Sequence, residues 1–225
     1  MCGIAGYFAL DIERANKFDI DRAITFLARR GPDDRGVETY SCEGRQVVFA
    51  HTRLSIIDLT SGGHQPIHST DKRLSMVFNG EIYNFKELRQ ELGDLGISFR
   101  TQSDSEVLLA AWAQWGVKCL QRLVGMFAVV VLDRNRQSLT FIRDGFGIKP
   151  LYIARTENGV CFASELPAIL ALRGVRSELN LQVAYDYLVH GDYDGHESTF
   201  VQSVEQVAPG TMLELDLQSG RWDTP

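Results

Sequence analysis

Apolar positions in the first part of the chain alternate between short extended runs and a stretch with helical spacing. Residues 2–10 form an uncharged, β-rich run that is typical of a buried strand. Apolar residues between 20 and 27 then repeat at helical spacing after Asp19, a suitable cap, and the Gly-Pro pair at 31–32 ends this helix. Residues 47–57 return to an extended pattern. The pattern therefore predicts a strand, a helix and a second strand.

The middle of the chain predicts one strand followed by two amphipathic helices. Residues 75–78 form a short strand that runs into the Asn-Gly pair at 79–80. Asn84 caps a helix with a regular apolar face, which Gly96 ends. The capping-box pattern at 103–106 then opens a second helix. This segment therefore supplies helices that can cover a sheet.

The last hundred residues change to hairpins, helices and a final strand. Antiparallel hairpins covered by helices are typical of an α+β fold with antiparallel sheets. The strong Asn-Gly turn signal at 158–159 places one of the hairpins. The expected hairpins are 126–132 with 138–143 and 151–154 with 160–163, the expected helices are 165–172 and 181–190, and the expected final strand is 211–217.

Composition and charge exclude several classes of protein. The chain has 225 residues, of which 44% are hydrophobic and 23% charged, so it can bury a core as one large domain or two small ones. A net charge of −6 argues against a surface for nucleic acid or for an anionic membrane. No apolar run approaches the ~18 residues of a membrane span. We therefore expect no nucleic-acid partner and no membrane partner.

The cysteines and histidines show no metal-binding or disulfide pattern. Four cysteines are widely spaced without a CxxC pair, and five histidines add no ligand spacing, so we expect no metal site. Cys42, Cys119 and Cys161 suit ordinary thiols in a reducing compartment. The start of the chain also lacks a basic segment followed by an apolar one, so we expect a cytoplasmic protein.

The end of the sequence suggests that the chain continues into another domain. Only five residues follow Gly220, and one of them is Trp222, an apolar side chain that needs a partner. Exposed apolar ends are usually tied down by further structure. We therefore expect residues 211–225 to hold a final strand and the start of a linker.

The start of the sequence offers a candidate nucleophile. Removal of Met1 would make Cys2 the amino terminus, so that one residue carries both a thiol and a free α-amine. An α-amine has a pKa of about 7.7–8.0 and can serve as the base that activates such a thiol. Taken alone, Cys2 is better explained as a small residue behind an initiator methionine.

Further residues could bind a substrate, and each has a structural alternative. Asn79 and Gly80 could supply two donors to an oxyanion, or they could form a hairpin turn. Arg53 could bind a carboxylate, or it could lie on a solvated strand face. Asp104 and Glu81 could bind an ammonium group, although an acid at position 104 also suits the first turn of a helix. Together these groups suit an amino acid with a side-chain carbonyl, such as glutamine.

Ordered strings of residues along the chain resemble the glutaminase domain of the asparagine synthetase family. This domain is a class II glutamine amidotransferase of the N-terminal-nucleophile (Ntn) hydrolase superfamily. The resemblance covers residues 1–165, with a weaker echo to Pro209-Gly210. The matching strings are Met1-Cys2-Gly3-Ile4-Ala5-Gly6, Arg30-Gly31-Pro32-Asp33, His51-Thr52-Arg53-Leu54-Ser55-Ile56-Ile57-Asp58, Gly63-His64-Gln65-Pro66, Phe78-Asn79-Gly80-Glu81-Ile82-Tyr83-Asn84, Ser103-Asp104-Ser105-Glu106, Arg143-Asp144 with Phe146-Gly147-Ile148-Lys149-Pro150-Leu151-Tyr152, and Phe162-Ala163-Ser164-Glu165.

The resemblance implies a fold and a role for each site residue. The implied fold is a four-layer αββα sandwich of two antiparallel sheets, the Ntn-hydrolase fold. The implied chemistry is glutamine hydrolysis through a γ-glutamyl thioester, which releases ammonia and then glutamate. The implied site has Cys2 as nucleophile with its freed amine as base, Asn79 and Gly80 as the oxyanion hole, Arg53 on the α-carboxylate, Leu54, Ser55, Ile56 and Ile57 as the pocket lining, and Glu81 and Asp104 on the α-ammonium.

The resemblance also implies how the domain would be used. Residues 1–210 would form the glutaminase domain, which needs no cofactor, and ATP and magnesium would bind only in a separate C-terminal domain that makes asparagine from aspartate. The expected partners are glutamine and that synthetase domain, and a homodimer is left open. One alternative keeps the glutaminase chemistry but serves another acceptor, such as a sugar carboxylate. A second alternative is a non-catalytic scaffold domain of the same fold.

Overall fold

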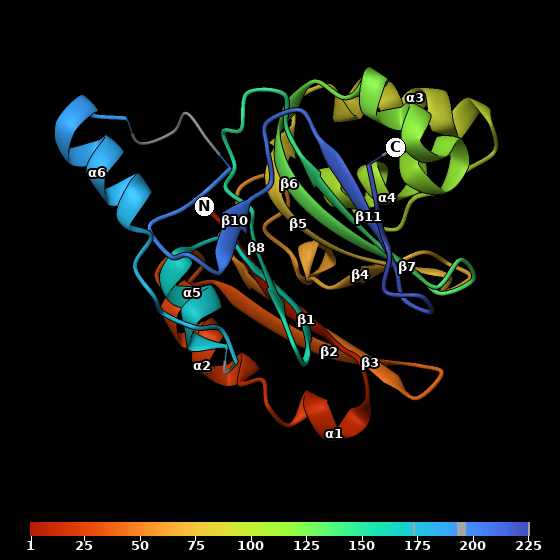
Figure 1. Ribbon diagram of the computed structural model, residues 1–225. Helices are drawn as coiled ribbons and strands as arrows, with labels where there is room; N and C mark the ends of the chain where they lie inside the picture. Colours follow the sequence, from red (N-terminus) through yellow and green to blue (C-terminus); the bar gives the residue numbers. More distant parts are fainter. Residues whose placement is uncertain (173, 193–196, 225) are drawn as a thin grey trace.

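The protein is a four-layer sandwich in which two antiparallel sheets pack face to face between helices (Figure 1). The computed structural model describes residues 1–172, 174–192 and 197–224. Helices α1, α2 and α5 cover the outer face of the first sheet, and α3 and α4 cover the outer face of the second. This arrangement confirms the predicted α+β fold with an αββα architecture.

The first sheet has six strands in the order β10-β8-β9-β1-β3-β2, and every neighbouring pair is antiparallel. Its central strand β1 leads directly away from Cys2. The strands are β1 (Gly3–Ala9), β2 (Asp34–Cys42), β3 (Arg45–Arg53), β8 (Tyr152–Thr156), β9 (Gly159–Ala163) and β10 (Val204–Gln206).

The second sheet has six strands in the order β12-β11-β7-β6-β5-β4, again antiparallel throughout. Its strand β5 contains Asn79 and Gly80. The strands are β4 (Ile67–His68), β5 (Leu74–Ile82), β6 (Gly125–Asp133), β7 (Ser138–Arg143), β11 (Met212–Asp216) and β12 (Trp222–Asp223).

The helices fall into two outer layers and one projecting element. On the first sheet lie α1 (Ile12–Ala15), α2 (Ile20–Leu27) and α5 (Leu166–Ala171), and on the second lie α3 (Phe85–Asp94) and α4 (Asp104–Trp115). Helix α6 (Leu181–His190) projects from the body, and η1 (Ser61–Gly63) and η2 (Gly116–Arg122) are short 3-10 turns. No helix within the described ranges is long and apolar enough to cross a membrane.

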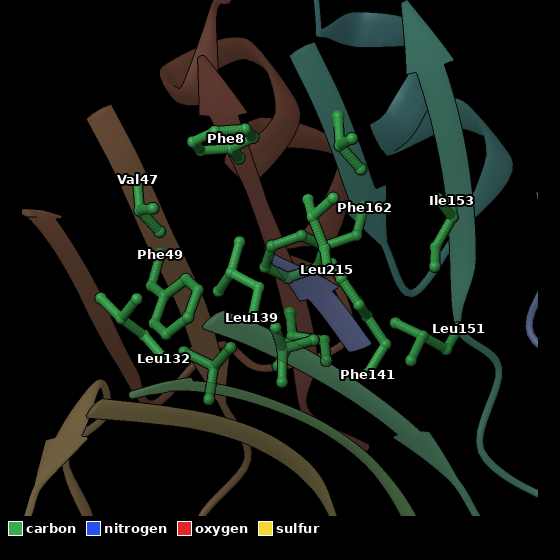
Figure 2. Packing of buried hydrophobic residues seen from close by; sticks show 14 of the residues in the cluster. Phe8, Val47, Phe49, Leu132, Leu139, Phe141, Leu151, Ile153, Phe162 and Leu215 are labelled. Atoms are coloured by element: carbon green, nitrogen blue, oxygen red, sulfur yellow. The ribbon is translucent and has the colours of Figure 1, made fainter. Parts of the chain in front are cut away.

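Three apolar clusters hold the four layers together, one at each interface between layers. The central cluster lies between the sheets, where Phe49 and Phe162 from the first sheet meet Phe141 from the second (Figure 2). Every residue of β1 is buried because the strand faces this cluster on one side and the helices on the other. Burial on both faces explains why β1 reads as a continuous apolar run rather than an alternating one.

Several predicted elements are confirmed, and the structure adds strands that the pattern did not show. Helix α2 begins after Asp19, whose side chain accepts a hydrogen bond from the N–H of Arg22, as predicted. Both predicted hairpins are present. The edge strand β2 was not predicted, because its sequence is mostly polar and only part of it is buried.

Two predicted helix caps differ in detail from the structure. The side chain of Asn84 does not cap α3; it joins the chain near η2 through the carbonyl of Arg122 and the N–H of Val124, both at 2.9 Å. Ser103 caps α4 as predicted, but Glu106 does not complete the capping box. Its carboxylate accepts instead from the N–H groups of Arg100 and Thr101.

Trp222 finds its partner within this chain. It lies in β12, its ring centroid is 5.6 Å from that of Phe141, and the guanidinium of Arg155 lies over it. The unpaired tryptophan is therefore no longer a reason to expect a further domain. Strands β11 and β12 place residues 212–216 and 222–223 in the second sheet, and Pro225 lies outside the described residues.

Candidate active site

The thiol of Cys2 lies at the start of β1, against the backbone of Leu54. Its Sγ is 3.5 Å from the Leu54 nitrogen and 3.7 Å from the Leu54 carbonyl oxygen. Arg30 holds the segment in place, because its Nε donates to the carbonyl of Cys2 at 2.8 Å while its Nη1 pairs with Glu165 at 2.9 Å. The nucleophile candidate is therefore held by contacts to two distant parts of the chain, Leu54 and Arg30, and Glu165 in turn holds Arg30.

Burial keeps the thiol of Cys2 protonated. Burial raises its pKa, and the hydrogen bond with Leu54, the charge of the terminal ammonium and the charge of Arg53 offset that effect only in part. The thiolate is the nucleophilic form of cysteine. Attack by Cys2 near neutral pH therefore requires a base that removes the proton.

Asn79 and Gly80 lie in the middle of β5, so the predicted hairpin-turn alternative is wrong. They pair with Ala128 and Phe127 of β6. The side chain of Asn79 is 1% exposed, and neither its oxygen nor its nitrogen has a hydrogen-bond partner among the described residues. An unpaired buried amide is costly, which makes it a candidate donor for a ligand.

The backbone N–H of Gly80 points away from β6, towards the side of β5 that no described strand covers at this position. The N–H of Phe78 donates to Gln65 at 2.7 Å and the N–H of Ile82 donates to Asp104 at 3.0 Å, both on the side away from β6. Backbone groups alternate sides along a strand, so the N–H of Gly80 shares this direction. A side chain at position 80 would meet the carbonyl oxygen of Met126 at 2.2 Å, so packing against β6 also requires glycine.

One pocket brings together all but one of the predicted site residues. Ser55 does not line the pocket, and its N–H donates to the carboxylate of Asp33 at 2.7 Å. The nine that line the pocket are Cys2, Arg53, Leu54, Ile56, Ile57, Asn79, Gly80, Glu81 and Asp104, and the pocket wall also includes Met1, Asp58 and Lys149.

Arg53 is a buried cation at the end of β3, so the alternative of a solvated strand face is wrong. It is 7% exposed, and its guanidinium donates to the carbonyl of Thr60 at 2.7 Å and to the carbonyl of Asp58. Gly63 packs against it so closely that a Cβ there would lie 2.0 Å from Nη2. No carboxylate among the described residues forms an ion pair with Arg53. Its charge is therefore available to a ligand carboxylate.

Asp104 combines the two interpretations that its position in the sequence allows. It is the first residue of α4, and it also lines the pocket beside the half-buried Glu81. Burial raises its pKa to about 6, although the hydrogen bond from the N–H of Ile82 acts in the opposite direction. An ammonium group in the pocket would restore the charged form of Asp104.

The structure adds polar residues that the sequence pattern did not identify. Contacts to the pocket segments come from Arg30, which binds the carbonyl of Cys2 and pairs with Glu165, and from Asp33, which accepts from the N–H of Ser55. Asp58, in the pocket wall, accepts from the N–H of Gln102. Their only signal was their presence in the ordered strings, which carry no information on contacts. Lys149 also lines the pocket, and its ammonium has no ion-pair partner among the described residues.

Comparisons with known sequences show which family this chain matches. Residues 1–223 match the family described as "Glutamine amidotransferase domain". The chain is 36% identical over 80% of its length to asparagine synthetase [glutamine-hydrolyzing] 3 of Bacillus subtilis, and 33% identical over 91% of its length to amidase chry2 of Gibberella zeae. It covers 29% and 30% of those two proteins, so it spans about a third of the length of these relatives.

A solved structure supports the fold. Glutamine phosphoribosylpyrophosphate amidotransferase from B. subtilis superposes with a TM-score of 0.69, over all of this chain and 49% of that chain. The sequences are 19% identical, so this similarity supports the fold alone. The four layers are therefore shared with a known amidotransferase.

Proposed function

This chain belongs to the class II glutamine amidotransferase family, and we propose that it is a glutaminase with Cys2 as its nucleophile. The observation that carries this proposal is the convergence in one pocket of the partly buried Cys2 thiol, an unpaired Asn79 amide, the cation Arg53 and the acid Asp104. These groups match the side-chain carbonyl, the α-carboxylate and the α-ammonium of glutamine.

The first step needs a free α-amine on Cys2, and removal of Met1 would create it. That amine, with a pKa of about 7.7–8.0, would take the proton from the Cys2 thiol. The thiolate sulfur then attacks the side-chain carbonyl carbon of glutamine, and the carbonyl oxygen becomes an oxyanion. The Asn79 amide and the N–H of Gly80 donate hydrogen bonds to it.

The remaining steps release both products. The protonated amine gives its proton to the leaving nitrogen, the C–N bond breaks, and ammonia departs from a γ-glutamyl thioester on Cys2. Water, deprotonated by the same amine, then attacks the thioester, and the C–S bond breaks to release glutamate and restore the thiol. The sequence of steps consumes one glutamine and one water.

The destination of the ammonia is the finer part of the proposal. The names of several relatives, asparagine synthetase [glutamine-hydrolyzing], support asparagine as the final product. We propose that the ammonia passes to an ATP-dependent synthetase domain that makes asparagine from aspartate, with ATP and magnesium bound there. We place the glutaminase domain at 1–210 and the final strand, with the start of a linker to that synthetase domain, in 211–225. An acceptor of another kind, such as a sugar carboxylate, is the second candidate, because a relative of similar identity, amidase chry2, does not carry the name of an asparagine synthetase.

The cellular setting follows from the cysteines. All four are free thiols, and three of them are buried. Buried unpaired thiols support a reducing compartment such as the cytoplasm.

The direct test is the release of glutamate and ammonia from glutamine by the purified chain. We expect equal amounts of both products, and we expect Cys2→Ala to abolish their release while glutamine still binds. Cys42→Ala is the matched control, because this buried thiol lies in the central core and outside the pocket. A Met1-free chain that releases no glutamate would support the non-catalytic scaffold instead.

A further inference from the structure

The two charged halves of the pocket come from segments that lie far apart in the sequence. Arg53 ends β3 and is followed by the loop at 54–60, whereas Asp104 begins α4 and is preceded by the segment at 101–103. Glutamine carries its α-carboxylate and its α-ammonium on one carbon, so the distance between these groups is fixed. A site that binds both groups must therefore hold Arg53 and Asp104 at a matching distance.

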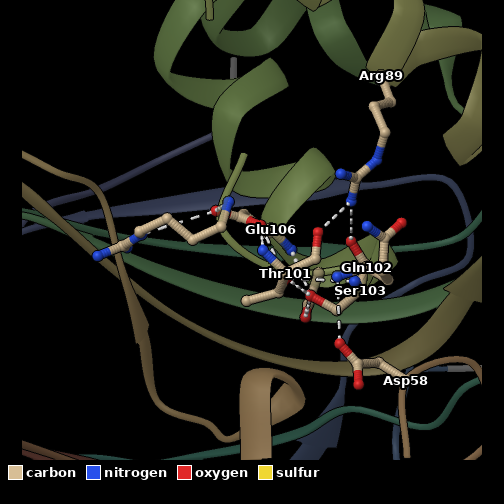
Figure 3. Close-up of polar contacts among 8 residues, drawn as sticks. Asp58, Arg89, Thr101, Gln102, Ser103 and Glu106 are labelled. Carbon is tan, nitrogen blue, oxygen red and sulfur yellow. Dashed lines mark hydrogen bonds and ion pairs between the residues drawn. The ribbon is translucent and has the colours of Figure 1, made fainter. Parts of the chain in front are cut away.

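Asp58 makes contact with both halves. Its Oδ1 accepts from the N–H of Thr60 at 2.8 Å and from the Thr60 hydroxyl at 2.6 Å. Its Oδ2 accepts from the N–H of Gln102 at 3.2 Å, across 44 positions of sequence (Figure 3). Its own carbonyl accepts from the guanidinium of Arg53. A single residue therefore links the Arg53 loop to the segment before Asp104.

The segment at 101–103, which Asp58 contacts, is held by several further hydrogen bonds. Glu106 accepts from the N–H and the hydroxyl of Thr101 at 2.8 and 2.7 Å, and Arg89 donates to the carbonyls of Thr101 and Ser103 (Figure 3). Ser103 in turn caps α4 through the N–H of Glu106. Hydrogen bonds therefore connect the segment at 101–103 to the first turn of α4, where Asp104 lies.

A role confined to the local turn does not explain these contacts. The two bonds to Thr60 form an ordinary turn around an aspartate, and one carboxylate oxygen is enough for them. The second oxygen leaves the loop to bind Gln102, and the side chain is 7% exposed. Bonds from a carboxylate to backbone N–H groups are among the stronger hydrogen bonds, and burial strengthens them further.

We propose that Asp58 is a positioning residue that sets the distance between the carboxylate-binding and ammonium-binding halves of the glutamine site. The proposal rests on the proposed glutaminase function and deepens it. Asp58 does not touch the reacting atoms; it acts through Arg53 and through the segment before Asp104. Its contribution therefore appears only for ligands that contact both halves at once.

The test compares ligands that carry both charges with ligands that carry one. Asp58→Asn cannot accept at both Thr60 and Gln102, because one of its two polar atoms is a donor. We expect this variant to raise the KM for glutamine about tenfold and to change kcat less than threefold. The inhibition constant of glutamate should rise by the same factor, whereas those of glutarate, which lacks the ammonium, and 4-aminobutyrate, which lacks the α-carboxylate, should change less than twofold.

Two further variants separate the proposed role from a general loss of structure. Asp216→Asn is the matched control, because Asp216 also accepts from two N–H groups and one hydroxyl, at Gln218 and Ser219, in a turn outside the pocket. It should leave all four constants unchanged. Asp58→Ser keeps one oxygen for the local turn and lacks the second one. It should show the same changes in the constants as Asp58→Asn, and it replaces that variant if Asp58→Asn folds poorly.

The outcomes that overturn the proposal are distinct from failure of the glutaminase function. An unchanged KM in both Asp58 variants, or an equal weakening of all three inhibitors, shows that Asp58 does not set the distance between the halves. If Asp216→Asn raises the KM for glutamine and the inhibition constant of glutamate as Asp58→Asn does, the effect is not specific to Asp58 and the proposal is wrong. Wild-type protein that neither binds nor hydrolyses glutamine overturns the proposed function and this role with it.

Discussion

Cys2 and Leu54 are joined through the sulfur of one and the backbone of the other, with Sγ 3.5 Å from the Leu54 nitrogen. Leu54 directly follows Arg53, so the segment that holds the nucleophile also carries the cation for the substrate carboxylate. The thiol therefore lies next to the residue that we propose binds the substrate carboxylate. Each site residue has its own proposed role, so substitutions should affect different measured quantities.

Activity should depend on removal of Met1, because the Cys2 thiol, whose pKa is raised, needs the free amine as its base. Intact mass of active protein should show the loss of one methionine. Insertion of a lysine between Met1 and Cys2 should block this removal and abolish glutamate release, although the thiol is still present. Full activity in protein that retains Met1 would contradict the amine mechanism.

Arg53→Ala should mainly raise the KM for glutamine, by about 100-fold, because a carboxylate contact acts in the ground state and the transition state alike. Loss of the bonds to Thr60 and Asp58 should also lower the free energy of unfolding, by about 1–3 kcal/mol. Steady-state kinetics and urea unfolding measure the two effects. If the KM stays unchanged while stability falls, Arg53 supports the loop and does not bind the substrate.

Asn79→Ala should lower kcat about 100- to 1000-fold with little change in KM, because its amide acts on the oxyanion. The side chain has no hydrogen-bond partner among the described residues, so no such bond is lost from the folded protein. Asn84→Ala is the contrasting control: it loses two hydrogen bonds and should lower stability by about 1–3 kcal/mol without changing kcat. If Asn79→Ala instead lowers stability and leaves kcat unchanged, while Asn84→Ala lowers kcat, Asn79 is not part of the oxyanion hole.

Binding of the product glutamate should weaken as the pH falls below about 6. Burial raises the pKa of Asp104 to about 6, so below that pH the acid is neutral and attracts an ammonium group less. The inhibition constant of glutamate reports this titration separately from that of the catalytic amine. In Asp104→Asn the inhibition constant of glutamate should no longer change with pH near 6. If it still changes, another group is responsible for this pH dependence.

The same pKa shift predicts an effect on stability. The folded-state pKa of Asp104 lies above the unfolded value of 3.8, so the folded protein binds more protons between these two values. The contribution of Asp104 to stability therefore falls as the pH rises through this range, and above pH 6 it is unfavourable. Asp104→Asn should be more stable than wild type at pH 7, by up to about 3 kcal/mol, as thermal or urea unfolding would show.

Local patterns were sufficient for much of the secondary structure. Helix α2 was predicted because its cap and its apolar spacing lie within one short segment, and the hairpin at Asn158 was predicted from the turn itself. Strand β2 was missed because an edge strand is specified by its neighbour β3 rather than by its own polar sequence. Asn79 and Gly80 carried a turn signal that pairing with β6 overrides.

The sequence by itself determined the candidate groups: a thiol beside a terminal amine, an amide, a cation and two acids, in an order that resembles one family. The tertiary structure alone decided that Cys2, Arg53, Asn79 and Asp104 share a pocket, since two strands, a helix and the residue that precedes β1 carry them there. It also decided their chemical state. The raised pKa of Asp104 and the missing partners of Asn79 arise from burial by residues distant in the chain, and no local pattern contains that information.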